Sequence, residues 1–194
     1  MTESKVIERL REFAPAIIAA GTRVPNRCIA ATAVGCSVLE AFEIEARPFP
    51  VLVEIANRAF VEARARGADD VTAVARGGHI MLISPEPVAN GWCGHLMIHV
   101  PTHALLIDLD FQQFRRLEQQ IAAAPAELFP WPAGTTSRAY TNPDGARMAI
   151  QATDDRTWEG SPDWSDRNRR RPMVTELIRA IRKNRLGRII QKTT

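Results

Sequence analysis

The stretch from Cys28 to Ile44 constrains the fold more than any other part of this chain, because nearly all of its side chains are apolar or small. A helix that is apolar on every side belongs in the interior. Pro25 and Asn26 precede it, and Asn26 is a good N-cap, so we predict a buried central helix with Cys28 in its first turn. Unpaired backbone N–H groups and the helix dipole stabilise a thiolate there. Cys28 is therefore a candidate nucleophile; the alternative is a small buried hydrophobe, as we expect for Cys36.

The composition predicts an ordinary globular domain with a sizeable core, since 45% of the 194 residues are hydrophobic and 24% are charged. No apolar run is long enough to span a bilayer, and the N-terminus has a charged amphipathic pattern rather than that of a signal peptide. The chain has three cysteines, Cys28, Cys36 and Cys93. So small and odd a number argues against a disulfide framework and for a reducing compartment. We therefore expect a cytoplasmic protein with no membrane partner, and the sequence leaves its oligomeric state open.

The charge is concentrated at the C-terminus. Residues 165–194 hold ten Lys or Arg and two Asp or Glu, a net +8, whereas residues 1–164 hold 15 basic and 20 acidic residues, a net −5. Most such basic runs are solvated helix faces, which is the interpretation we favour here. The alternative is an electrostatic surface for nucleic acid or another acidic partner, although no helix-turn-helix or zinc pattern accompanies it.

Hydrophobic spacing predicts a mixture of helices and antiparallel strands. The predicted helices cover 4–20, 28–43, 58–66 and 111–124, and a last helix starts at Pro172. The predicted strands cover 46–56, 71–75, 79–84, 95–100, 104–110, 138–141 and 146–153, and residues 125–134 are expected to be a connection. His99 and His103, near the tip of the hairpin formed by strands 95–100 and 104–110, are expected to face water. The sequence thus predicts an α+β fold.

The same hairpin brings two chemically useful side chains together. With a turn at 101–102, His95 lies opposite Asp108, and directly opposed residues in an antiparallel ladder share a face with Cβ atoms roughly 4.5–5.5 Å apart. At that separation a carboxylate can fix the orientation and tautomer of an imidazole. Asp110, on the same face, is the fallback acid.

A Cys that opens a buried helix, a His on a strand and an Asp on the next strand resemble the transglutaminase-like branch of the papain-type cysteine enzymes, which includes the arylamine N-acetyltransferases. The matching stretches are Arg27-Cys28-Ile29-Ala30-Ala31, Glu43-Ile44-Glu45-Ala46-Arg47, Gly94-His95-Leu96 and Leu106-Ile107-Asp108-Leu109. The resemblance covers roughly residues 4–115. Glu43 stands where these families usually have Gly, and the aromatic residue often found soon after the Cys or the His is absent. The resemblance implies a Cys-bearing helix packed on an antiparallel sheet with flanking helices.

The mechanism implied is cysteine-dependent acyl transfer or amide hydrolysis, without a cofactor, on a small-molecule or protein acyl substrate. Cys28 would attack the carbonyl, His95 would move the proton, and Asp108 would hold the imidazolium. The backbone N–H of Cys28 would meet the oxyanion. Asn26 and Trp92 are candidates for a second donor or for lining the substrate.

Two other interpretations of these residues remain open. Cys93 and His95 form a Cys-x-His pair that could join Cys28 and Asp108 in a metal site, but paired Cys-x-x-Cys spacing is missing, so we expect no metal.

We assign residues 1–164 to a transglutaminase-like catalytic domain and 165–194 to a basic helix packed on it. The alternative function is a non-catalytic binding protein on the same fold that uses this basic helix for nucleic acid or another acidic partner.

Overall fold

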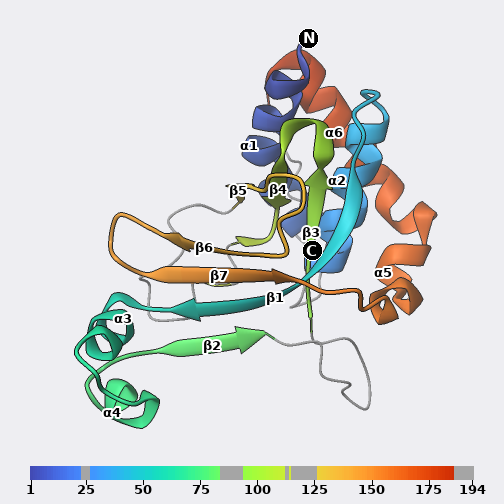
Figure 1. Ribbon diagram of the computed structural model, residues 1–194. Helices are drawn as coiled ribbons and strands as arrows, with labels where there is room; N and C mark the ends of the chain where they lie inside the picture. The colour runs from blue at the N-terminus through green and yellow to red at the C-terminus, as the bar shows by residue number, and fades with distance from the viewer. Residues whose placement is uncertain (23–26, 84–93, 112–113, 115–125, 186–194) are drawn as a thin grey trace.

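The computed structural model describes residues 1–22, 27–83, 94–111, 114 and 126–185, and shows an α+β fold built on a curled antiparallel sheet (Figure 1). The strand order is β5-β4-β3-β1-β7-β6, and β2 also pairs with β1. The strands are β1 (Arg47–Ala56), β2 (Ile80–Ile83), β3 (His95–Val100), β4 (Leu105–Asp108), β5 (Glu127–Pro130), β6 (Ser137–Thr141) and β7 (Arg147–Ala152). The helices are α1 (Glu3–Gly21), α2 (Cys28–Glu40), α3 (Arg58–Ala65), α4 (Asp70–Ala75), α5 (Pro162–Ser165) and α6 (Arg167–Lys183), and short 3-10 turns cover Pro101–His103 and Thr157–Gly160.

Strand β1 lies in the middle of the sheet and pairs with β3, β2 and β7. On one side its first half pairs with β3, from Arg47 opposite His99 to Val51 opposite His95, and its second half pairs with β2. On its other side β7 runs along residues 51–56. In Figure 1 the helices α1, α2 and α6 stand together at one end of the sheet, while α3 and α4 lie at the opposite end. The candidate site belongs to the end with α2.

One face of the sheet is covered by α1, α2 and α6. The apolar positions of α1 keep helical spacing, and its buried side chains Val6, Leu10, Phe13 and Ile17 join Val34 and Val38 of α2 and Leu177 of α6 in one cluster. From the sheet, Ile98, Val100 and Ile107 pack into the same cluster. The predicted amphipathic first helix and the apolar central helix are therefore both present, and α2 is buried along most of its length.

The opposite face of the sheet curls over a second apolar cluster. Its strand residues are Val51, Val53, Ile55, Met97, Leu106, Phe129, Met148 and Ile150, and Phe111, Phe114 and Trp131 fill the space between them. Strand β3 contributes to both clusters, because Ile98 and Met97 point to opposite faces. All six residues of β3 are buried as a result.

Helix α2 is followed by Glu43, which has an unusual backbone conformation. The Ile44 N–H donates to the Leu39 carbonyl and the Glu43 N–H donates to the Glu40 carbonyl, which is the Schellman pattern that ends many helices. This motif requires a left-handed residue, and Glu43 has φ 60°. Glycine is favoured there because it has no Cβ. The backbone at position 43 therefore suits Gly better than the Glu that stands there.

The β3–β4 hairpin has a different register from the predicted one. Ile98 pairs with Ile107 and Val100 with Leu105, because residues 101–104 form a 3-10 turn followed by left-handed Ala104 (φ 49°) instead of a turn at 101–102. The pairing is shifted by two residues, so Asp108 falls opposite Met97 and lies diagonally from His95. Since side chains alternate with a period of two, Asp108 remains on the predicted face.

Three other expectations about elements were wrong. Residues 70–75 form α4 rather than a strand, because the Asp69 side chain accepts the Thr72 N–H at 2.7 Å and caps a helical turn. Helix α6 begins at Arg167, not at Pro172, since the Asp166 carboxylate caps it. Residues 127–130, predicted as a connection, form β5 on the edge of β4. Most of the predicted helix 111–124 lies outside the described residues.

His99 also differs from expectation, because it is buried rather than facing water. Arg47 Nε donates to His99 Nδ1 at 3.2 Å, and the Phe49 ring packs against the imidazole. Burial, and then the Arg47 charge, lower the pKa of His99. His103 is partly exposed and pairs with Glu3 Oε2 at 2.7 Å.

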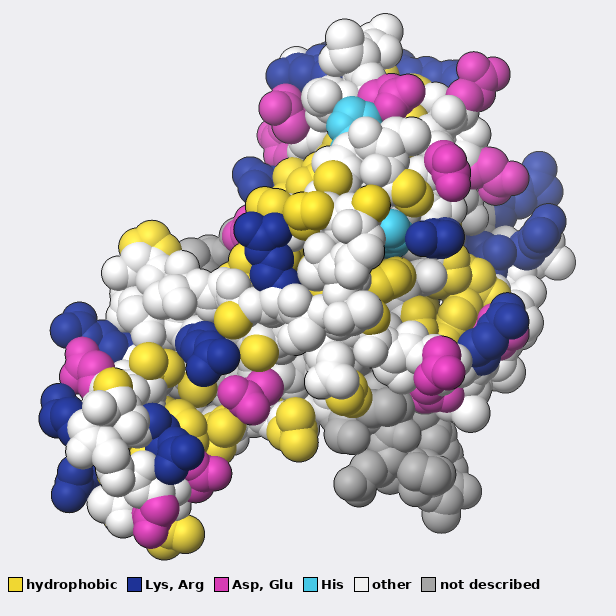
Figure 2. All heavy atoms as spheres, in the orientation of Figure 1, with side chains coloured by type: hydrophobic (Ala, Val, Ile, Leu, Met, Phe, Trp, Pro, Cys, Tyr) yellow, Lys and Arg dark blue, Asp and Glu magenta, His cyan; other side chains and the backbone are white. Residues whose placement is uncertain are grey.

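The surface that Figure 2 shows carries both signs of charge, interspersed with apolar side chains over the end formed by α3 and α4. Among the described residues, none of the helices is long and apolar enough to cross a membrane.

Candidate active site

Cys28 is the first residue of α2 and is buried, with 5% of its surface exposed. The N-cap position is held by Arg27, not by Asn26 as predicted, and Asn26 lies outside the described residues. A carboxylate from another element takes part in this helix start, because the Arg27 N–H donates to Asp110 Oδ2 at 3.2 Å. Further along α2, the Thr32 hydroxyl donates to the Leu96 carbonyl at 2.9 Å and fixes the helix on β3.

His95 and Asp108 form a buried pair beside this helix start. His95 Nε2 lies 2.8 Å from Asp108 Oδ2, and the two side chains are 0% and 1% exposed. Diagonal neighbours in a ladder have Cα atoms about 7–8 Å apart, still within reach of a long side chain such as histidine. The structure therefore brings Cys28, His95 and Asp108 together from α2, β3 and β4.

The surroundings of His95 have opposing effects on the pKa of its imidazole. Burial lowers its pKa, whereas the Asp108 carboxylate and a hydrogen bond with the Cys28 side chain raise it, and the pKa of His95 is raised overall from 6.5 to about 10. The ring is therefore protonated at neutral pH. A protonated imidazole between a thiol sulfur and a carboxylate is arranged to donate a proton to a leaving group.

Asp110, the fallback acid, joins the helix start to the end of β4. Its own backbone N–H donates to Asp108 Oδ1 at 2.9 Å, and its carboxylate accepts the Arg27 N–H. Asp108 thus uses one oxygen for His95 and the other for the Asp110 backbone. This chain of hydrogen bonds fixes the position of Asp108 relative to the first turn of α2.

Comparisons of this chain with models of protein families, with curated proteins and with solved structures found no match. The chemical argument therefore depends on the geometry of the site.

Aromatic side chains that sequence reasoning did not place surround the three residues. The Phe114 ring packs edge-on against the His95 ring, with centroids 5.1 Å apart. Trp158 is buried in a cluster with Cys28 and Leu96, and Trp164 packs against this cluster. The sequence did carry a signal for them, because two tryptophans stand in an otherwise polar stretch. Large apolar rings are usually buried against other residues, so this stretch could have been expected to pack on the core.

Some predicted members of the site cannot be placed. Trp92, proposed as a second oxyanion donor, and Cys93, part of the metal alternative, lie outside the described residues. Among the residues that the structure does describe, no three His, Cys, Asp or Glu side chains gather in a way that could hold a metal ion.

Proposed function

We propose that the protein is a cysteine-dependent acyltransferase or amide hydrolase on a papain- or transglutaminase-like fold. The observation that carries this proposal is the buried pairing of His95 with Asp108 at 2.8 Å, next to a cysteine that opens a central helix. Burying a charged imidazole and a carboxylate costs free energy, and perturbed buried groups of this kind gather at functional sites.

In the first half of the reaction, Cys28 attacks as the thiolate, with the proton held on His95. Its target is the carbonyl carbon of an amide, ester or thioester. An S–C bond forms, and the carbonyl electron pair moves to oxygen. The Cys28 backbone N–H, which belongs to the first turn of α2, would donate to the oxyanion. When the tetrahedral intermediate collapses, the bond to the leaving group breaks and His95 donates its proton to that group.

In the second half, an acceptor attacks the thioester on Cys28. Water gives hydrolysis and an amine gives transfer; in either case His95 takes the proton of the acceptor and the Cys28 sulfur leaves. Asp108 holds the imidazole in place through both halves, and its second oxygen is fixed by the Asp110 N–H. This division of roles is the common logic of nucleophile, base and orienting acid.

Acylation of the protein by a small acyl thioester tests the proposal directly. We expect intact-mass and peptide analysis to show an acyl adduct on Cys28 in the wild type, and none there in Cys28→Ala. His95→Ala should slow adduct formation by roughly 10²–10⁴-fold, the usual contribution of a general acid–base group. Cys36→Ala is the matched control, since burial raises the pKa of the Cys36 thiol to about 12. Equal acylation of the two cysteines would contradict the proposal.

A binding protein that uses its basic helix instead would not need a reactive Cys28. Part of the basic run has an internal role, because Arg169 pairs with Asp163 at 2.8 Å and Arg170 donates to the Trp164 carbonyl. Iodoacetamide at pH 6 separates the two functions. The enzyme should be alkylated on Cys28 much faster than on Cys36, and His95→Ala should slow that labelling.

A further inference from the structure

The side chains that cluster with Cys28 are apolar. Leu96 and Trp158 are buried against Cys28, and Ile29 and Trp164 pack on the same cluster while remaining partly exposed. These four neighbours of Cys28 are all uncharged. In Figure 1, α5 and the turn before it lie beside the end of α2 that begins with Cys28. The apolar cluster that contains Cys28 therefore reaches the surface of the protein at Ile29 and Trp164.

Trp158 and Trp164, which we call the tryptophan pair, pack against each other. Their rings meet edge to face, with centroids 4.6 Å apart and an interplanar angle of 85°. The indole N–H of Trp158 donates to the Asp155 carbonyl at 3.0 Å, so the polar end of that ring is already satisfied inside the protein. What Trp158 offers to its surroundings is the flat apolar part of the ring.

The basic start of α6 holds the tryptophan pair in place. Arg170 donates to the carbonyl of Trp164, and Arg169 pairs with Asp163 in the same turn. Ser161 caps this turn by accepting the Asp163 N–H at 3.2 Å. These contacts are all made by the protein's own groups, and side chains that are held in place in advance favour affinity.

We infer that the tryptophan pair selects the acyl group, and that the donor carries an uncharged apolar acyl group, with an aromatic ring favoured over a small alkyl group. This inference rests on the proposed function. An aromatic ring next to two indoles gains edge-on or offset contacts as well as buried area. A carboxylate in the same place would lose its hydration. The cations beside the cluster would not compensate, because His95 is already paired with Asp108 and Arg170 already donates to the Trp164 carbonyl.

The test compares three acyl donors with one small leaving group: acetyl, benzoyl and succinyl thioesters of N-acetylcysteamine. The rate of Cys28 acylation is measured by mass spectrometry for each donor and divided by its rate with free cysteine, which removes intrinsic reactivity. In the wild type we expect the normalised rate for benzoyl to exceed that for acetyl by about tenfold, and the rate for succinyl to be the lowest. Trp164→Ala should remove the benzoyl preference and Trp164→Phe should retain most of it.

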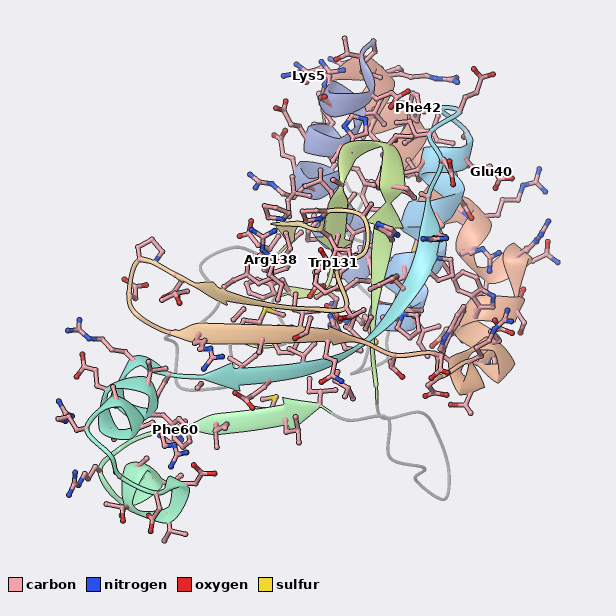
Figure 3. The ribbon with its side chains drawn as sticks, in the orientation of Figure 1. Lys5, Glu40, Phe42, Phe60, Trp131 and Arg138 are labelled. Atoms are coloured by element: carbon pink, nitrogen blue, oxygen red, sulfur yellow. The ribbon has the colours of Figure 1, made fainter. Side chains whose placement is uncertain are left out.

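Phe42→Ala is the matched control, because Phe42 is a partly buried aromatic residue at the opposite end of α2 (Figure 3). It should leave the ratios unchanged. Similar normalised rates for all three donors in the wild type, or a benzoyl preference that survives Trp164→Ala, would overturn the inference and leave the proposed function standing. The absence of any Cys28 adduct with all three donors would instead overturn the proposed function. The wild-type ratios decide the question even if Trp164→Ala does not fold.

Discussion

His95 is a fully buried histidine that keeps its proton, and this combination makes the protein sensitive to pH. Its pKa of about 10 in the folded state lies above the ordinary value of 6.5, so the folded protein holds this proton more tightly than the unfolded chain. The resulting stabilisation is complete below about pH 6.5 and disappears as the pH rises toward 10.

Asp108→Asn should reveal this dependence, because it removes the charge that raises the pKa. We expect the difference in free energy of unfolding between wild type and Asp108→Asn to be largest near pH 6 and to shrink toward pH 10. Urea unfolding at a series of pH values measures it. His103→Gln, at a partly exposed histidine, is the control, and a difference that does not vary with pH would contradict the assignment.

Glu43, like Ala104 and Asn184, is a non-glycine residue with a left-handed backbone conformation. A non-glycine residue in the left-handed region costs roughly 1–2 kcal/mol, part of which glycine loses again through its freer unfolded chain. Since the Glu43 side chain is exposed, Glu43→Gly should stabilise the protein by up to about 1 kcal/mol. Thermal and urea unfolding measure the change. Glu45→Gly, at an exposed neighbour that is not left-handed, should not stabilise.

At the level of single residues, the sequence predicted the three polar members of the site but not the aromatic ones. Asp108 could be predicted despite the wrong register, because the pairing is shifted by two residues, and a shift by an even number keeps every side chain on its face. Trp158 could not be placed, because it lies far from Cys28 in the sequence and comes next to it only through tertiary packing. No local pattern encodes such a contact.

Helix α6 combines a buried stripe with an exposed basic face, and these two surfaces have different consequences for stability. Leu177 is fully buried between α6, α1 and α2, so Leu177→Ala should cost about 2–5 kcal/mol. Arg171, on the exposed face, should tolerate replacement by Ser with a change within about 0.5 kcal/mol. Urea unfolding compares the two variants. Comparable losses would mean that the exposed face is as important as the packing.

The elements themselves were predicted best where the hydrophobic period is long. The pattern of α1 and of the apolar α2 is repeated over several turns, and both helices are present. Short segments were predicted less well: residues 71–75 were predicted as a strand, but the Asp69 side chain caps a helix over residues 70–75. Likewise, the Asp166 cap starts α6 before the proline that the sequence suggested as its first residue.

On the scale of the whole molecule, the candidate site and the end formed by α3 and α4 belong to different apolar clusters. Phe60 (Figure 3) packs with Ala56, Ala63 and Ala73 in a small cluster of its own. Phe60→Ala should therefore destabilise α3 and α4 while leaving the site intact. We expect faster amide hydrogen exchange within residues 58–75 and an unchanged rate of Cys28 alkylation. A slowed alkylation would show that the two ends are coupled.

The four-residue turn between β3 and β4 also bears on how a chain of this kind can change in length during evolution. A shift of the pairing by two residues leaves both Asp108 and Asp110 on the face of His95, so one acid or the other stays within reach of the imidazole. A shift by one residue moves both acids to the opposite face. Insertions and deletions at this hairpin should therefore survive only in pairs, whereas changes of length in the segment around α3 and α4, which enters neither the site nor its cluster, should leave the site unchanged.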